Sequence, residues 1–133
     1  MSGARNIDAV RGMFEAYRAG ASERALEFMH PEVTYDATVR PDGKVWHGRE
    51  GVRSAMAEWT DAWEGFELEI EEYLEAGAEH VAVLWRERGR APASGVETAE
   101  AGVSVFTLRD GLIVAIQTGV DREAALRGLG LEP

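Results

Sequence analysis

The sequence contains no cysteine and a single lysine, Lys44, among its 133 residues. The absence of cysteine excludes disulfides, thiolate metal sites and thiol catalysis. No run of about 18 apolar residues is present, which excludes a membrane-spanning helix. The stretch from Met1 to Ile7 also lacks the apolar block of a signal peptide. We therefore expect a cytoplasmic protein that does not bind membranes.

Basic residues are few compared with acidic ones. The chain has 14 Lys and Arg against 24 Asp and Glu, a formal net charge of −10. Such a surface repels phosphate backbones, so we do not expect nucleic acid as a partner. The three histidines show no metal-ligand spacing with a carboxylate, and Gly48 to Gly51 lacks the Lys-Ser/Thr of a phosphate loop. We predict no metal and no cofactor.

The length and the 45% hydrophobic content are typical of one globular domain, which we expect to span residues 1–133. Helical spacing of apolar residues predicts a helix capped by Asn6 and ending at Gly20, then a short helix from Ser22. A third helix follows Gly48. Its apolar stripe consists of Val52, Met56, Trp59 and Trp63.

The second half of the chain alternates between apolar and polar residues, which is typical of strands. We expect strands at 66–71, 80–88, 96–108 and 112–120, with a bulge near Glu72 where the alternation blurs. A final helical turn or two follows Asp121. This order predicts an α+β fold in which about three helices cover the concave face of a strongly bent antiparallel or mixed sheet, around an internal pocket.

The dipeptide Asp110-Gly111 is the strongest hairpin signal in the sequence. A two-residue turn there pairs Arg109 with Leu112 and, counting outward, Ser104 with Gln117. Phe106 shares their face. A polar pair among small and apolar residues is what a pocket wall needs. Alternatively, the two polar side chains bond each other in a filled core.

The opposite face of this hairpin is also uncharged and rich in β-branched residues, so it needs a cover. With the helices already assigned, we expect a second copy of the chain to provide it, giving a homodimer. The alternative is an exposed face that the protein merely tolerates. The expected dimer face consists of Val103, Val105, Val114, Ile116 and Thr118.

Alternation on the strand 80–88 places Trp85 and Glu87 towards the pocket. Among aromatic side chains the pKa of a carboxylate rises, which suits Glu87 as a general acid or base. Alternatively, Glu87 is a solvated charge or pairs with one of the arginines beside it. The hydroxyl of Tyr17 can donate a hydrogen bond either to a ligand or to a backbone carbonyl in the core. The tryptophans Trp46, Trp59, Trp63 and Trp85 either line an aromatic cavity or fill the core.

Three segments together resemble the SnoaL-like branch of the nuclear transport factor 2-like superfamily. They are VRGMFEAYRAGASERALEFMHPEVTYD, WHGREGVRSAMAEW and SVFTLRDGLIVAIQTGVDREAAL, and the resemblance covers the chain from about Asn6 to Gly130. It implies a cone of helices on a bent sheet with a deep pocket, and dimers through the outer face. It also implies polar pocket groups at the end of the first strand, which we expect at 33–36. There Tyr35 and Asp36 point to opposite faces, so one of them enters the pocket.

Functions in this superfamily range from isomerases, cyclases and hydrolases to binding modules. Ketosteroid isomerases place a tyrosine and two aspartates where this chain has Met13, Ala37 and Ser104, so that activity is not expected. One hypothesis is a cofactor-free isomerase, cyclase or hydrolase acting on a small hydrophobic molecule, with Glu87 and Asp36 as the acid and base. The alternative is a non-catalytic ligand-binding or dimeric assembly module.

Overall fold

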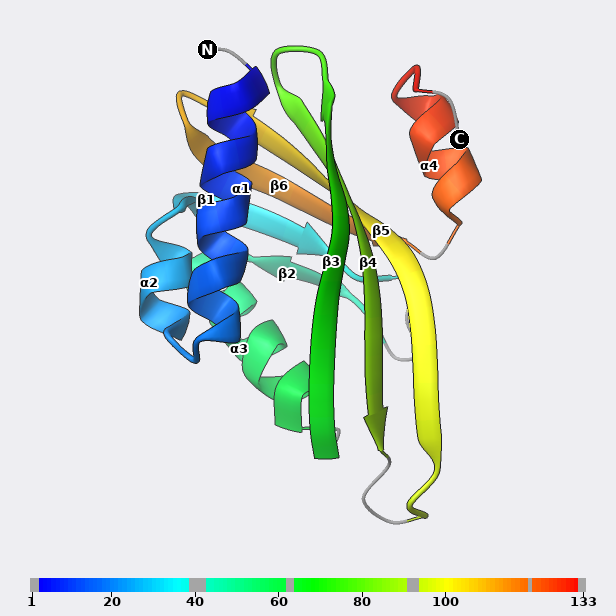
Figure 1. Cartoon of the computed structure of the whole chain (residues 1–133). Helices are drawn as coiled ribbons and strands as arrows, with labels where there is room; N and C mark the ends of the chain where they lie inside the picture. The colour runs from blue at the N-terminus through cyan, green and yellow to red at the C-terminus, as the bar shows by residue number, and fades with distance from the viewer. Residues whose placement is uncertain (1–2, 39–42, 62–63, 91–93, 120, 132–133) are drawn as a thin grey trace.

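A computed structural model describes residues 3–38, 43–61, 64–90, 94–119 and 121–131. Six strands form one sheet in the spatial order β2-β1-β6-β5-β4-β3 (Figure 1). The strands are β1 (Met29–Asp36), β2 (Val45–His47), β3 (Glu64–Ala76), β4 (His80–Arg90), β5 (Glu97–Arg109) and β6 (Leu112–Gly119). The helices are α1 (Gly3–Arg18), α2 (Ser22–Leu26), α3 (Gly48–Asp61) and α4 (Arg122–Gly128).

The sheet is mixed, because β1 pairs with β6 in parallel while the other neighbouring pairs are antiparallel. The longest strands, β3, β4 and β5, curve along their length (Figure 1). The β3 register shifts between Ile70 and Glu72, close to the expected bulge. Such a shift adds local twist and bend. The predicted α+β fold with a bent mixed sheet is therefore confirmed.

Helices α1, α2 and α3 lie over one face of the sheet, and the main core fills the space between the two layers (Figure 1). Val10 and Phe14 belong to the buried stripe of α1, and the Phe14 ring meets the Phe106 ring edge to face with centroids 5.6 Å apart. Asn6 does not cap α1 as expected. It lies inside the helix and donates to the Ala78 carbonyl at 2.7 Å, which ties α1 to the β3–β4 turn. None of the helices in the described ranges is long and apolar enough to span a bilayer.

The β5–β6 hairpin has the predicted turn. Asp110 and Gly111 have positive φ angles of 53° and 81°, and Arg109 pairs with Leu112. Farther from the turn the pairing skips Val114, so β6 carries one extra residue there. A bulge of this kind exchanges the faces of the residues that follow it.

Beyond this bulge the predicted register is wrong. Ser104 pairs with Thr118 and not with Gln117, while Phe106 pairs with Ile116. Gln117 is therefore exposed and does not belong to the pocket wall. Ile116 and Thr118, which we expected on the outer dimer face, are instead buried on the inner face, 6% and 7% exposed.

The outer face of the sheet is partly covered by α4. Leu126 of this helix packs with Ala82 and Val103 in a second, smaller core cluster. Val103 is thus covered within one chain, although we expected a second copy to cover it. Val105 and Val114 remain only partly buried. The expected dimer face is therefore reduced to these two residues.

Candidate functional site

A partly open cavity of about 100 Å³ lies between helices α1 and α3 and the inner face of the sheet. Its wall is mostly apolar, with a few converging polar groups, as is typical of small-molecule sites. Helix α1 contributes Met13, Phe14 and Tyr17, and α3 contributes Val52, Ala55 and Met56. The sheet contributes Met29, Tyr35, Leu68, Trp85, Glu87, Ser104, Phe106, Ile116 and Thr118.

Four polar groups on this wall form one hydrogen-bonded chain. The Trp85 indole N–H donates to the Ser104 hydroxyl at 2.9 Å, and the Ser104 and Thr118 hydroxyls lie 3.1 Å apart. Thr118 donates to the Tyr35 hydroxyl oxygen at 3.4 Å. An indole N–H can only donate, so the Ser104 hydroxyl oxygen accepts from Trp85. The Ser104 hydroxyl proton is then available to donate to Thr118. The Tyr35 O–H at its end then remains to donate to a further acceptor.

Gly102 makes room for the indole of Trp85. The two residues are partners on β5 and β4, and Trp85 is 3% exposed. A Cβ atom at position 102 would lie 2.5 Å from Cζ2 of Trp85 and 2.5 Å from the Gly119 carbonyl oxygen. The indole therefore packs against the Gly102 backbone. It lies so close that any side chain at position 102 would collide with the ring.

Glu87 is the carboxylate of the cavity wall. It pairs with Leu68 on β3 and with Glu100 on β5, and it is 8% exposed. Its chain neighbours Arg86 and Arg88 are exposed, as alternation requires. Glu87 is therefore not a solvated surface charge.

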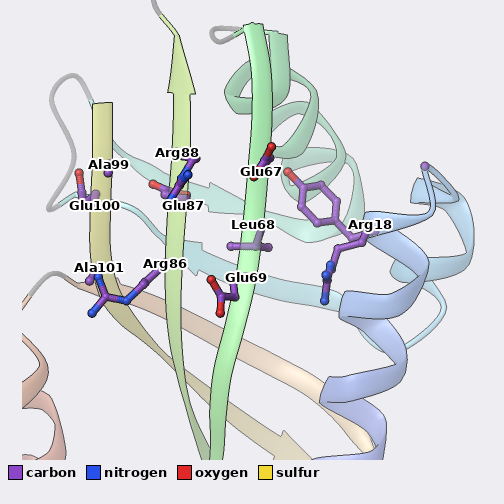
Figure 2. A pocket seen from close by; sticks show the side chains of 12 residues that line it. Arg18, Glu67, Leu68, Glu69, Arg86, Glu87, Arg88, Ala99, Glu100 and Ala101 are labelled. Atoms are coloured by element: carbon purple, nitrogen blue, oxygen red, sulfur yellow. The ribbon is translucent and has the colours of Figure 1, made fainter. Parts of the chain in front are cut away.

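A cleft of about 800 Å³ adjoins the cavity, at the ends of β3, β4 and β5 and beside the end of α1 (Figure 2). Tyr17, Leu68 and Glu87 line both the cleft and the cavity. Glu87 thus lies where an apolar interior meets an open, charged surface. The other charged residues of the cleft are Arg18, Glu67, Glu69, Arg86, Arg88 and Glu100.

Asp36, the second acid–base candidate, lies apart from both hollows. Its carboxylate accepts hydrogen bonds from the Thr38 hydroxyl at 2.7 Å and the Thr38 backbone N–H at 3.0 Å. These two bonds favour the charged form and lower the pKa of Asp36. Of the two neighbours at the end of β1, Tyr35 is the one that lines the cavity.

The four tryptophans are distributed differently. Trp85 lines the cavity, whereas Trp46 is half-buried on β2 beneath the Lys44 ammonium, 4.1 Å from its ring centroid. Trp59 belongs to α3, but its side chain lies outside the description, and Trp63 falls outside the described residues. In the described ranges, no three His, Asp or Glu side chains are grouped so that they could hold a metal ion.

The structure brings together six of the candidates that the sequence analysis named. They are Tyr17, Tyr35, Trp85, Glu87, Ser104 and Phe106. Thr118 is the polar residue that sequence reasoning placed on the wrong face. One signal favours the observed register: it buries Ile116 and exposes Gln117, as the polarities of these side chains prefer.

A model of the SnoaL-like domain family matches residues 10–116. No curated protein matches the sequence. The fold is shared by several crystal structures. One is TerC co-crystallized with polyporic acid, which is 23% identical, with 95% of this chain and 98% of that chain covered and a TM-score of 0.74.

Two bacterial structures share the fold at lower sequence identity. A putative polyketide cyclase from Xanthomonas campestris is 18% identical, covering 95% of this chain and 97% of that one, with a TM-score of 0.72. A Mycobacterium tuberculosis protein in complex with estradiol-17beta-hemisuccinate is 19% identical, covering 92% and 97%, with a TM-score of 0.69. At these identities the likeness establishes the fold alone.

Proposed function

The chain belongs to the SnoaL-like domain family of the nuclear transport factor 2-like superfamily, and on that premise we propose that it binds a small hydrophobic molecule at the junction of cavity and cleft. The observation that carries this proposal is the position of Glu87. It is a nearly buried carboxylate shared by an apolar cavity and an open cleft. A ligand that lies across the two hollows would contact this group.

The sizes of the two hollows indicate how such a ligand lies. Sites for drug-sized molecules measure roughly 300–1,000 Å³, so a cavity of about 100 Å³ holds only part of one. The rest of the ligand would occupy the cleft of about 800 Å³. Similar folds with polyporic acid and with a steroid hemisuccinate support a ligand of this kind.

We further propose that Glu87 exchanges a proton with the ligand in a cofactor-free isomerase, cyclase or hydrolase reaction. The Tyr35 O–H, at the end of the hydrogen-bonded chain, would hold a ligand oxygen inside the cavity. Asp36 is less suited as the partner base, because its bonds to Thr38 stabilise the charge and it lies outside the cavity. Proton transfer is therefore assigned to Glu87.

A thermal-shift screen with polyporic acid, estradiol-17beta-hemisuccinate and related hydrophobic carbonyl compounds tests the binding proposal. Any ligand is then incubated with the protein and followed by mass spectrometry for conversion. Glu87→Gln should retain binding and lose about 10²–10⁴-fold in rate, the usual contribution of a general acid or base. Glu69→Gln is the control, because Glu69 is an exposed carboxylate that lines the cleft but not the cavity. Conversion by Glu87→Gln at the parent rate would remove Glu87 from the chemistry.

A non-catalytic binding module is the second candidate. One observation favours it: among the described residues that line the cavity, Glu87 is the single carboxylate. Ligand binding by the parent protein without any conversion would support this alternative.

We also retain the homodimer as a proposal, now through Val105 and Val114, the expected face residues that α4 leaves partly exposed. Light scattering of the parent and of Val105→Arg measures the mass directly. A parent protein that stays monomeric over a 100-fold range of concentration would contradict the dimer. The cytoplasmic location stays a prediction.

A further inference from the structure

Arg122, the first residue of α4, connects this outer helix to three neighbouring strands. Its Nε–H donates to the Gly102 carbonyl at 3.0 Å, and its Nη2 donates to the Trp85 carbonyl at 2.7 Å. The same Nη2 pairs with the carboxylate of Glu71, the residue that the bulge adds to β3. One guanidinium therefore joins α4 to β3, β4 and β5.

The two carbonyls belong to residues that shape the cavity. The Trp85 indole rests against Gly102, and its N–H begins the hydrogen-bonded chain through Ser104. A small movement of either backbone would change the position of the ring, because the ring lies so close to Gly102 that an added Cβ would be 2.5 Å from it. The contacts of Arg122 thus act on the main chain of the residues that carry the indole wall.

We infer that Arg122 is a positioning residue, which fixes Trp85 and thereby lets the docking of α4 set the shape of the ligand cavity. The inference rests on the proposed function, since the cavity is the proposed ligand site. A planar guanidinium suits this role, because its fork of donors can reach two carbonyls and a carboxylate together.

Helix α4 also offers a matched control. Arg127 lies on the same helix and pairs with Glu123, one turn before it. Both of these side chains are exposed. Arg127→Gln therefore makes the same chemical change as Arg122→Gln, with the same loss of charge, but it breaks a contact within α4 and not one with the strands.

The test uses the full chain labelled with 5-fluorotryptophan, which gives one fluorine resonance for each of its four tryptophans. Trp85→Phe assigns the resonance of Trp85. Arg122→Gln should move the Trp85 resonance beyond its parent line width and leave the other three in place, whereas Arg127→Gln should move none. Circular dichroism confirms that each variant is folded. If Arg122→Gln does not fold, Arg122→Lys takes its place, because it keeps the charge beside Glu71 but lacks the planar fork.

An unmoved Trp85 resonance in a variant with a lowered melting temperature would overturn the inference and leave Arg122 as an anchor of α4 only. Equal effects of the two glutamine variants would overturn it too. A second readout is the affinity for 1-anilinonaphthalene-8-sulfonate, which should weaken at least threefold in Arg122→Gln alone. Because the fluorine signal needs no ligand, a failure of the proposed binding function would leave the test of Arg122 intact.

Discussion

The two faces of the sheet are built from the same strands but are covered by different kinds of contact. On the inner face, helices α1 and α3 and the sheet line an apolar cavity, and a chain of hydrogen bonds runs along its wall. On the outer face, α4 covers a smaller area with Leu126 and binds the strands through Arg122 and Glu71. The inner contacts depend on close fit, whereas the outer ones leave charged groups in contact with water. We therefore expect substitutions on the inner face to cost more.

The largest difference is expected between two glycines. Gly102→Ala would force a methyl group into the Trp85 ring and the Gly119 carbonyl, and overpacking of this kind costs about 1–3 kcal/mol. Gly119→Ala places its methyl group where no heavy atom lies within 4 Å, so it should change the free energy of unfolding by less than about 0.5 kcal/mol. Urea unfolding measures both. Equal costs would mean that Trp85 does not rest on Gly102.

A smaller difference is expected across the bulge in β6. Thr118→Val keeps the shape of a buried side chain but removes the hydroxyl between Ser104 and Tyr35, which should cost about 1 kcal/mol. Gln117→Ala changes an exposed neighbour and should stay within about 0.5 kcal/mol. The same urea titrations compare the two. A larger cost for Gln117→Ala than for Thr118→Val would indicate that Gln117 is the buried residue, as in the register without the bulge.

The smallest effect is expected on the outer face, and it depends on pH. Hydrogen bonds from Arg122 and then Arg86 lower the pKa of Glu71 below its ordinary value of 4.5. A lowered folded-state pKa stabilises the protein above the ordinary value, and this contribution disappears as the pH falls through the lowered one. The melting temperature of the parent should exceed that of Glu71→Gln at pH 7, and the gap should close below pH 4.5. A gap that is constant down to pH 3 would contradict the pairing.

Much of the fold follows from local patterns in the sequence. The Asp110-Gly111 turn forms as predicted because both residues tolerate a positive φ angle. Trp85 and Glu87 lie on the inner face because the alternation of β4 is not interrupted in the segment that carries them. The same reasoning failed for Gln117, since one added residue at Val114 exchanged the faces beyond it.

The end of β1 shows a second limit. Alternation predicts that either Tyr35 or Asp36 enters the pocket, but it does not say which. The choice depends on the pairing of β1 with β6, in which Tyr35 lies beside Ile116 and Asp36 beside Gln117. That pairing joins segments about 80 residues apart, so no local signal in either strand specifies it.

The sequence by itself determined the order of helices and strands, the hairpin turn and the inward side of β4, because periodicity and turn chemistry act over a few neighbouring residues. Only the tertiary structure decided which side of β6 faces the cavity and which element covers Val103. Both faces of the last hairpin are uncharged, so the local pattern favoured the observed register only through the difference in polarity between Ile116 and Gln117. The contacts that select one of them come from α1, α4 and the distant strand β1, and they exist only once the chain has folded.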